Sequence, residues 1–542
     1  MSDAAPPSHR PRLTQAFAPL RTSPVPRVWL AALAVGVVAG YAAIGFRLAI
    51  GGVQFLWIGE SAENLFRFLA ATPPWLVVAG PTTAGLTVGL WLTFVQPQHR
   101  ALGVADAMHA RALGGGHMPV WQGLGSALVS VVSLGGGASA GREGPAVHLG
   151  ATLGSFLAAR FGFSAPQMRT LLAAGAAAAV AASFNAPIAG VLFALEVVLG
   201  HYALRASGPI VIASVTGALL ARFHLGSSPT FVIPDYLITG LLDFPAFALL
   251  GVVSAGVAII FMVALMHADT LACRIAMPLW LRPVVGGLLI GVIGIWYPHV
   301  LGVGYAATDA ALQGQLALGL LMSLVVVKTI ATAITLASRF GGGVFSPSLY
   351  VGAMTGGAFG MLITQAAPEV IFSTPEVYAI VGMGAVAGAV LGAPLSTLLI
   401  AFELTGGYAM TVALMMAISI ATALTQGLLG KSFFHWQLER RGLRLYGGPR
   451  WRILQTVRVH TFLQRVAADD ATPLQQLDPE DTRLLTDDTL DHALALFAAS
   501  GQPSLPVVHA DAPLEIIGTA THVGALEAYS AALVEAAREE HE

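Results

Sequence analysis

Several stretches of this chain are apolar over the length needed to cross a lipid bilayer. Three of them cover residues 75–95, 244–266 and 318–336, close to the roughly twenty residues that span the hydrocarbon core. Charged residues make up only 10% of the 542 positions, against roughly 25% in soluble globular proteins. The chain is therefore predicted to be an all-α polytopic membrane protein and not a soluble enzyme.

The few charges are concentrated near the C-terminus. Residues 437–542 hold 9 Lys or Arg and 16 Asp or Glu, whereas the 436 residues before them hold 18 and 13. This uneven distribution predicts a membrane domain over 28–436 and a soluble-like tail. Within the tail we expect a linker over 437–480 and a small folded unit over 481–542.

The charges that flank the spans predict how the chain lies in the membrane. Only one acid, Asp3, accompanies the four arginines that precede the first span. The last span is followed by Lys431, Arg440, Arg441 and Arg444. Because positive flanks favour the cytoplasm, we expect both termini, including a tail over 1–27, on the cytoplasmic side of the cell inner membrane.

The membrane domain contains an internal repeat. Residues 186–196 (APIAGVLFALE) match residues 393–403 (APLSTLLIAFE) 207 positions later, and GREGP at 141–145 lies 202 positions before GVFSP at 343–347. Because two ordered matches share nearly one offset, they predict one long repeat, which is typical of transporters built from two halves. An odd number of spans in each half would make the halves inverted. The expected halves are about 28–221 and 240–436.

Each half also carries a run of three glycines followed closely by proline, at Pro145 and at Pro347. Proline suits the first turn of a helix, and glycine suits the irregular chain that leads into it. Broken backbone survives in a membrane only where protein or water surrounds it, and free N–H groups at a helix start attract anions. We therefore expect two helix starts aimed at one anion site; tight helix packing without an ion is the alternative.

Glu143 stands two positions before Pro145 and matches Phe345 in the repeat. An acid inside a membrane costs about 2 to 3 kcal/mol or more and marks a functional position by default. When charged, this carboxylate would occupy the anion site as a tethered anion, and when protonated it would swing away. Glu143 is therefore predicted to be a gate, with a salt bridge to Arg142 as the alternative interpretation.

The sequence gives little support for an enzyme, a metalloprotein or a nucleic-acid-binding protein. Cys273 is the only cysteine, which excludes a disulfide framework and a multi-cysteine metal site. We find no nucleophile with a base, no metal-ligand cluster and no nucleic-acid signature, so we expect neither an enzyme nor a metal site. Lys328 and Arg339 are expected to reach lipid headgroups from the end of a span.

Over about residues 28–434 the chain resembles the CLC family of chloride channels and chloride/proton antiporters. The resemblance is carried by GREGP at 141–145, by GVFSP at 343–347, and by FNAP at 184–187 with Glu196. It implies a homodimer in lipid, with inverted halves, broken helices, one anion pathway per subunit and a gating role for Glu143. It also implies an anion site around the two motifs, at Gly141, Arg142, Gly144, Gly343, Val344 and Phe345.

Two positions depart from the family's ion-site pattern. Its first anion motif falls on residues 103–107, where Val104 replaces a serine, and its tyrosine on the last membrane helix falls on Phe434, or on Phe433 if the register slips. Both changes remove a hydroxyl donor. The resemblance then implies an inner anion site held mainly by backbone dipoles, which leaves the choice of anion open.

A third departure concerns protons. Proton-coupled members commonly carry a second glutamate, and the resemblance places it at Val197, which cannot carry a proton. Glu196 is next to it, but one step along an α-helix rotates a side chain by about 100°. Glu196 is therefore a weak candidate for a proton relay, and its repeat mate Glu403 suggests a structural role.

After residue 450 the sequence of the tail predicts a series of short helices and strands. Their β-α-β-β-α order, with LPVV at 505–508, resembles one CBS unit, and 453–463 is a candidate for a truncated partner. Units of this kind usually bind adenine nucleotides in pairs. With one unit visible we expect no cofactor; nucleotide binding and an inert assembly role are the alternatives.

The predicted function is chloride transport gated by Glu143, channel-like or weakly coupled to protons. A strict chloride/proton antiporter, and a pathway selective for another anion such as fluoride or nitrate, are alternatives within the family. From a different class, a membrane sensor whose tail reads a ligand is the remaining alternative.

Overall fold

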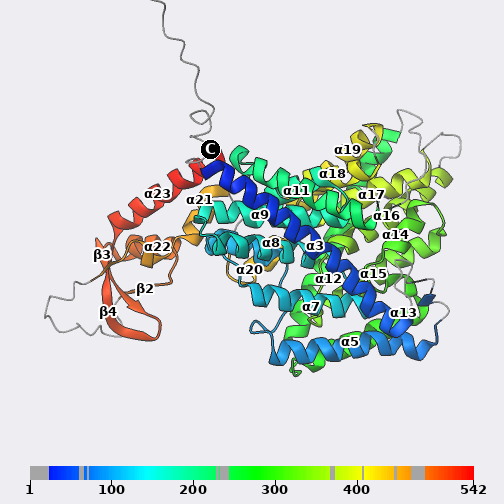
Figure 1. Ribbon diagram of the computed structural model, residues 1–542, viewed down its shortest axis with the longest axis horizontal. Coiled ribbons are helices and arrows are strands. Elements are labelled where there is room, and N and C mark those ends of the chain that lie inside the picture. Colours follow the sequence, from blue (N-terminus) through cyan, green and yellow to red (C-terminus); the bar gives the residue numbers. More distant parts are fainter. Residues whose placement is uncertain are drawn as a thin grey trace, which may run out of the picture.

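The chain folds into a helical membrane domain and a small α/β domain that extends from its side (Figure 1). The computed structural model describes residues 24–59, 66, 68–69, 72–226, 231, 243–366, 373–405, 408–444, 448–465 and 482–541. Residues 1–23 of the expected N-terminal tail and 466–480 of the expected linker lie outside the described residues.

The membrane domain consists of two successive sets of helices. The first set is α3 (Pro24–Ile58), α5 (Pro74–Phe94), α6 (Val104–Leu113), α7 (Val120–Gly135), α8 (Glu143–Arg160), α9 (Ala165–Phe184), α10 (Pro187–Phe193), the π-helical turn η1 (Ala194–Leu199) and α11 (Leu204–Leu225). The second set is α12 (Asp243–Arg274), α13 (Leu281–Trp296), the 3-10 turn η2 (Pro298–Val300), α14 (Tyr305–Leu312), α15 (Leu318–Ala337), α16 (Phe345–Ala366), α17 (Pro375–Leu391), α18 (Pro394–Thr405), α19 (Tyr408–Leu429) and α20 (Phe433–Glu439).

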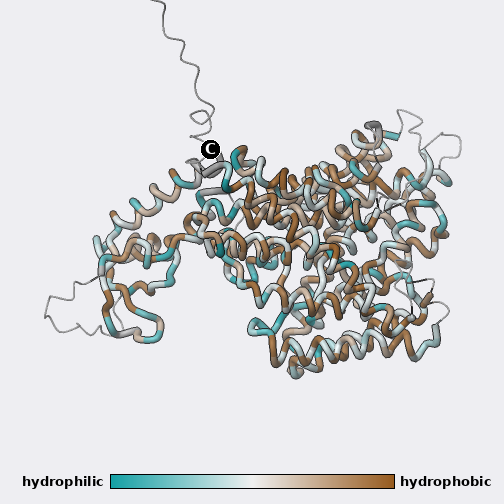
Figure 2. The backbone as a smooth tube through the Cα atoms, in the orientation of Figure 1, coloured by the Kyte–Doolittle hydropathy of each residue, from teal (hydrophilic) through white to brown (hydrophobic). Residues whose placement is uncertain are grey.

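Six stretches of the described chain are long and apolar enough to cross a membrane: α3, α5, α11, α12, α15, and α19 continued by α20. Apolar side chains cover their outer faces; Leu30 is 69% exposed and Leu204 is 81% exposed. Figure 2 shows the same apolar character over the helical domain. A surface of this kind is stable against lipid and not against water, so the domain is a multi-pass membrane protein.

The two sets repeat one another in order and in packing. In the first set α3 packs on α9 and α11, and in the second α12 packs on α17 and α19. The interior helices α9 and α17 are rich in alanine and glycine and are buried over most of their length, as expected for helices that are apolar on all sides.

Glycines allow the closest helix contacts, and they do so at equivalent places. A Cβ atom on Gly150 would lie 2.3 Å from the carbonyl oxygen of Gly175, and one on Gly352 would lie 2.4 Å from that of Gly382. Any larger residue would therefore push α8 away from α9, or α16 away from α17. Small residues at such contacts are the usual means of packing helices in membranes.

The described part of the C-terminal domain contains a four-stranded sheet in the order β1-β4-β3-β2. β3 pairs antiparallel with β4 and parallel with β2. Its remaining elements follow the expected β-α-β-β-α order after residue 481. The bounds are α21 (Gly448–Thr456), the 3-10 turn η3 (Val459–Thr461), β1 (Gln464–Arg465), β2 (Leu484–Leu485), α22 (Leu490–Ser500), β3 (Ser504–His509), β4 (Ala512–Thr521) and α23 (His522–His541).

The segment 453–463, considered above as a truncated second unit, packs into this same domain. Ile453 and Val459 lie in one core with Leu484, Phe497 and Leu505. The resemblance of the whole to a CBS unit stays a prediction.

Candidate functional site

The two halves of the membrane domain meet at the glycines that precede α8 and α16. The N–H of Gly141 donates to the carbonyl of Gly343 at 2.7 Å, and the N–H of Gly343 donates to the carbonyl of Gly141 at 2.8 Å. The two equivalent segments run antiparallel where they pair, as inverted halves require. The N–H groups of both glycines are thus taken up by this pairing, which positions the two helix starts.

Each of the two helices begins at the predicted motif. α8 starts at Glu143 and α16 at Phe345, so the starts differ by the repeat offset, and Pro145 and Pro347 lie in the first turns. The first N–H groups of a helix have no partner inside it. The ring of Phe345 packs against Phe184 and Phe193, with ring centres 5.1 and 6.0 Å apart, which fixes the first turn of α16.

The carboxylate of Glu143 is buried and bound at this junction. It accepts hydrogen bonds from the hydroxyls of Tyr305, at the start of α14, and Ser346, in the first turn of α16. Glu143 is only 1% exposed. The Nε of Arg142 lies 3.7 Å from one carboxylate oxygen, so the ion pair considered as an alternative is present beside the two hydroxyl contacts.

A cavity of about 280 Å³, here called the far-side cavity, reaches the junction from one direction. Arg142 and Tyr305 line it, together with Arg47 and His299. The guanidinium of Arg142 lies 4.6 Å from the centre of the Tyr305 ring, and both residues line this cavity. Two arginines therefore line the approach to Glu143.

Lys328 places a buried amino group next to Gly304, which lines the far-side cavity. Its side chain is fully buried, and its ammonium donates to the carbonyls of Val300 and Gly302 at 3.0 and 3.1 Å. The expectation that Lys328 reaches lipid headgroups is wrong, because it lies in the middle of α15 on the protein-facing side. Arg339, in contrast, lies beyond the end of α15 and pairs with Asp269 at 3.7 Å.

A second cavity, of about 340 Å³, reaches the junction from the face that carries the C-terminal domain. We call it the tail-side cavity. Gly144, Gly343 and Val344 line its inner end. Val104, at the start of α6, and both Phe433 and Phe434, at the start of α20, also line it, so the two substituted positions lie along this cavity.

Basic residues outnumber acids around the tail-side cavity. Asp106 binds Arg100 at 2.7 Å and Arg441 at 2.8 Å, and Asp269 pairs with Arg339 and Arg440. Burial opposes ionisation of Asp106, but its hydrogen bond from Arg100 and the nearby positive charges prevail and lower its pKa to about 2. Four cations against two acids leave this mouth positive, which favours anions.

Glu196 binds the start of α18, the helix that carries Glu403, and Glu403 binds the start of α10, the helix that leads into Glu196. Glu196 accepts from the N–H groups of Leu395 and Ser396 at 3.2 and 2.8 Å, at the start of α18. Glu403 accepts from those of Ile188 and Ala189 at 3.0 and 2.8 Å, at the start of α10. The pairing is reciprocal under the repeat, and it satisfies helix-terminal donors.

The turn that carries Glu196 is π-helical, not α-helical as assumed above. Glu196 and Val197 both line one small cavity, of about 180 Å³, together with Phe434 and His435. The carboxylate of Glu196 is nevertheless held by α18. Val197 presents only apolar atoms to this cavity.

Sequence reasoning missed the two hydroxyl partners of Glu143. Ser346 stands inside the second motif, and a polar residue at a helix start in the membrane was a usable signal. Tyr305 is 162 residues from Glu143, and only the packing of α14 brings it to the junction.

Two halves that pair at glycine-led helix starts, with a buried carboxylate between two cavities, define a membrane transport protein. Residues 84–426 match the family model described as "Voltage gated chloride channel". The chain is 33% identical over 392 residues to a ClcB-like chloride channel protein of Ralstonia nicotianae, covering 71% of this chain and 90% of that protein. It therefore belongs to the CLC family of anion channels and transporters, which confirms the predicted family.

Solved structures have the same fold. A slow cyanobacterial Cl⁻/H⁺ antiporter superposes with a TM-score of 0.67 at 24% identity, covering 77% of this chain and 98% of that one. A CLC-type fluoride/proton antiporter superposes with a TM-score of 0.61 at 21% identity, covering 74% and 95%. These matches confirm the predicted fold class of the membrane domain.

Proposed function

We propose that this protein carries chloride across the membrane through the far-side and tail-side cavities, with Glu143 as the gate between them. One observation carries the proposal: Arg142 lines one cavity and Gly144 lines the other, and the carboxylate of the residue between them is bound at the junction. A carboxylate held there occupies the place where a passing anion would bind. Transport then requires that this tethered anion leave.

Protonation supplies a way for the carboxylate to leave. The charged form of Glu143 accepts two hydroxyl hydrogen bonds and lies beside Arg142. A neutral carboxyl group loses the charge-assisted part of these contacts, so its bound position becomes less favourable. The hydroxyls of Tyr305 and Ser346 are then free to donate to an anion in its place.

The electrostatics of both cavities support an anion as the substrate. Arg47 and Arg142 line the far side, and an excess of arginine lines the tail side. Chloride is the anion named for the Ralstonia nicotianae relative reported above. Because Val104 and Phe434 bring no hydroxyl to the tail side, the backbone N–H groups of Val344 and Phe345, where α16 begins, are the donors we propose there.

We propose channel-like or weakly proton-coupled transport. Val197 cannot carry a proton, and the adjacent Glu196 is bound by the N–H groups of α18. A proton that reaches Glu143 from the tail side would therefore pass through water in the cavities. Strict anion/proton exchange is the competing mode, because proteins of similar fold include a Cl⁻/H⁺ antiporter and a fluoride/proton antiporter. The experiment below distinguishes the two modes.

We further propose that the protein acts as a homodimer in the cell inner membrane, with both termini cytoplasmic. Ile188 and Leu395 occupy equivalent positions on α10 and α18 and are 52% and 46% exposed. Both stand beside the carboxylates that cross-link the halves. A second subunit would cover these equivalent apolar faces together.

The decisive experiment is anion flux from liposomes that contain the purified protein. Chloride efflux that requires the protein, and reversal potentials measured with chloride, nitrate and fluoride at two pH values, test the substrate. With valinomycin to clamp the voltage, a chloride gradient should move few or no protons. Stoichiometric uphill proton movement would contradict the channel-like mode, and absence of any anion flux would favour a sensor instead.

A further inference from the structure

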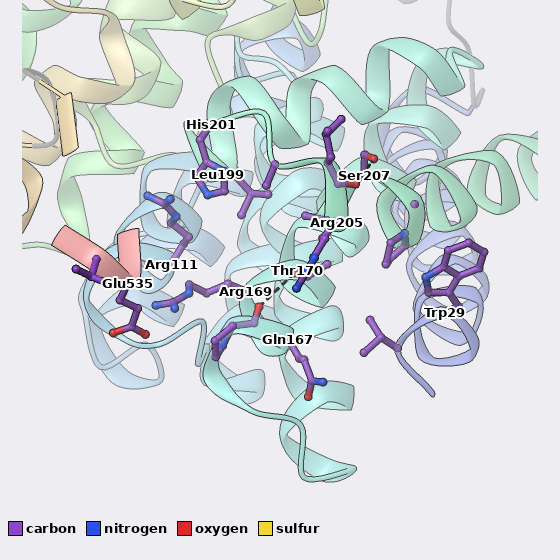
Figure 3. Close-up of a pocket in the computed structure, with 18 of the residues that line it drawn as sticks. Trp29, Arg111, Gln167, Arg169, Thr170, Leu199, His201, Arg205, Ser207 and Glu535 are labelled. Carbon is purple, nitrogen blue, oxygen red and sulfur yellow. Dashed lines mark hydrogen bonds between the residues drawn. The ribbon is translucent and has the colours of Figure 1, made fainter. Parts of the chain in front are cut away.

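A large cavity lies away from the ion pathway, between the membrane domain and α23 of the C-terminal domain. Its volume is about 1260 Å³. The starts of α3, α9 and α11 form one wall, and α23 forms another with Glu527 and Glu535. Figure 3 shows Trp29 on one side of this space and Glu535 on the other.

Three arginines from three different helices line this cavity. Arg111 comes from α6, Arg169 from the first turns of α9, and Arg205 from the first turn of α11. Figure 3 shows Arg169 and Arg205 directed into the space between Trp29 and Glu535. His201 contributes a fourth basic side chain. Arginines that converge in this way suit a phosphate group, whose oxygens accept their N–H donors in pairs.

The rest of the lining is largely apolar. Trp29, Leu204 and Val534 contribute large side chains, and Trp29 and Leu204 belong to membrane spans. At about 1260 Å³ the cavity is larger than the roughly 300–1,000 Å³ of most small-molecule sites. A phosphate with an apolar stem fits both parts of the lining, whereas a bare anion would leave the apolar part empty.

We propose that this cavity binds a phosphate-bearing amphiphile, and specifically an acidic phospholipid of the surrounding bilayer. The headgroup lies against Arg111, Arg169 and Arg205, and the acyl chain lies along Trp29 and Leu204. The N-terminal segment 1–23 is a poor alternative occupant, because it carries three arginines and one aspartate and so has the same sign as the arginines of the cavity.

Occupancy of the cavity bears on both neighbouring parts of the protein. Glu527 and Glu535 face the same space from α23, so a phosphate competes with them for the arginines. Arg111 also lines the small cavity that contains Val197 and Phe434, and Phe434 lines the tail-side cavity. Lipid bound at Arg111 is therefore placed to influence anion flux through α6.

The test uses the full-length protein purified from bilayers with and without phosphatidylglycerol and examined by native mass spectrometry. We expect retained phosphatidylglycerol, and a loss of affinity of at least about tenfold in the Arg169→Gln/Arg205→Gln double variant, because two charge-assisted contacts disappear. Arg274→Gln is the matched control, since this arginine is exposed at the end of α12 and lines none of the cavities described above. Glu527→Gln/Glu535→Gln should increase retention, which a misfolded variant would not do.

Two results would overturn the proposal. One is retention that is equal for phosphatidylglycerol and phosphatidylcholine, or unchanged by the double arginine variant. The other is binding of inorganic phosphate to the protein in phosphatidylcholine bilayers, together with displacement of phosphatidylglycerol by inorganic phosphate in bilayers that contain it. This result would assign the arginines to a soluble phosphate compound. Chloride flux with and without phosphatidylglycerol then measures whether the lipid regulates transport. We expect the lipid to change the flux of the parent protein and not that of the double arginine variant.

Discussion

The hydroxyl of Tyr305 donates a hydrogen bond to the carboxylate of Glu143, so α14 of the second half holds the first residue of α8 in the first half. This bond stabilises the position in which the carboxylate blocks the junction. We predict that Tyr305→Phe raises anion flux at neutral pH by at least about tenfold, because a hydrogen bond to a charged group contributes about 1.5–3 kcal/mol and 1.4 kcal/mol is about a factor of ten. Flux from liposomes at neutral and acidic pH measures the effect, which should shrink as Glu143 becomes protonated.

Tyr350→Phe is the matched control for this change. Tyr350 is also fully buried, and its hydroxyl has no hydrogen-bond partner among the described residues. Its loss should leave flux unchanged. Equal flux in Tyr305→Phe and Tyr350→Phe would remove Tyr305 from the gate.

A glutamine at the gate should abolish the pH dependence of flux. Glu143→Gln keeps the shape of the side chain but removes its charge, so the tethered anion no longer competes with the transported one. We expect flux at neutral pH as high as that of the parent at acidic pH. Glu376→Gln, in the first turn of α17 and outside the cavities described, should behave like the parent, and a Glu143→Gln protein whose flux still follows pH would refute the gate.

The reciprocal carboxylates Glu196 and Glu403 should prove equivalent for stability. Each accepts two backbone N–H bonds at a helix start of the other half. Replacing either by glutamine removes a charge from these bonds and should cost about 1–3 kcal/mol, which thermal unfolding in detergent would detect as a similar loss for both variants. If Glu196→Gln instead changed proton movement and left the unfolding temperature alone, Glu196 would be a proton relay after all.

Much of this architecture follows from local chemistry and is therefore readable from sequence. Glycine followed by proline defines a helix start wherever it occurs, and both helix starts were predicted at the motifs where α8 and α16 begin. The 202 and 207 offsets predicted which segments are equivalent. The antiparallel pairing of Gly141 with Gly343 is the structural counterpart of that repeat.

The partners of these segments could not be predicted in the same way. Tyr305 reaches Glu143 only through the packing of α14, and the two phenylalanines against Phe345 come from α9 and α10. Lys328 lies inside the protein and not at the lipid surface expected for it. The sequence alone does not tell which side of a span faces inward. The π-helical turn at Glu196 also differs from the α-helix that the sequence predicts there.

Val104 offers a direct test of the tail-side part of the pathway. It lies at the start of α6 and lines the tail-side cavity, as Gly343 and Val344 also do, so a serine there would add one hydroxyl donor to an anion held by backbone N–H groups. A net hydrogen bond of about 0.5–1.5 kcal/mol corresponds to about two- to tenfold in relative anion binding. We therefore expect Val104→Ser to shift the reversal potentials measured between chloride, nitrate and fluoride. Ala105→Ser is the control, since Ala105 is the next residue of α6 and is buried away from the cavity; equal reversal potentials in both variants and the parent would mean that α6 does not contact the transported ion.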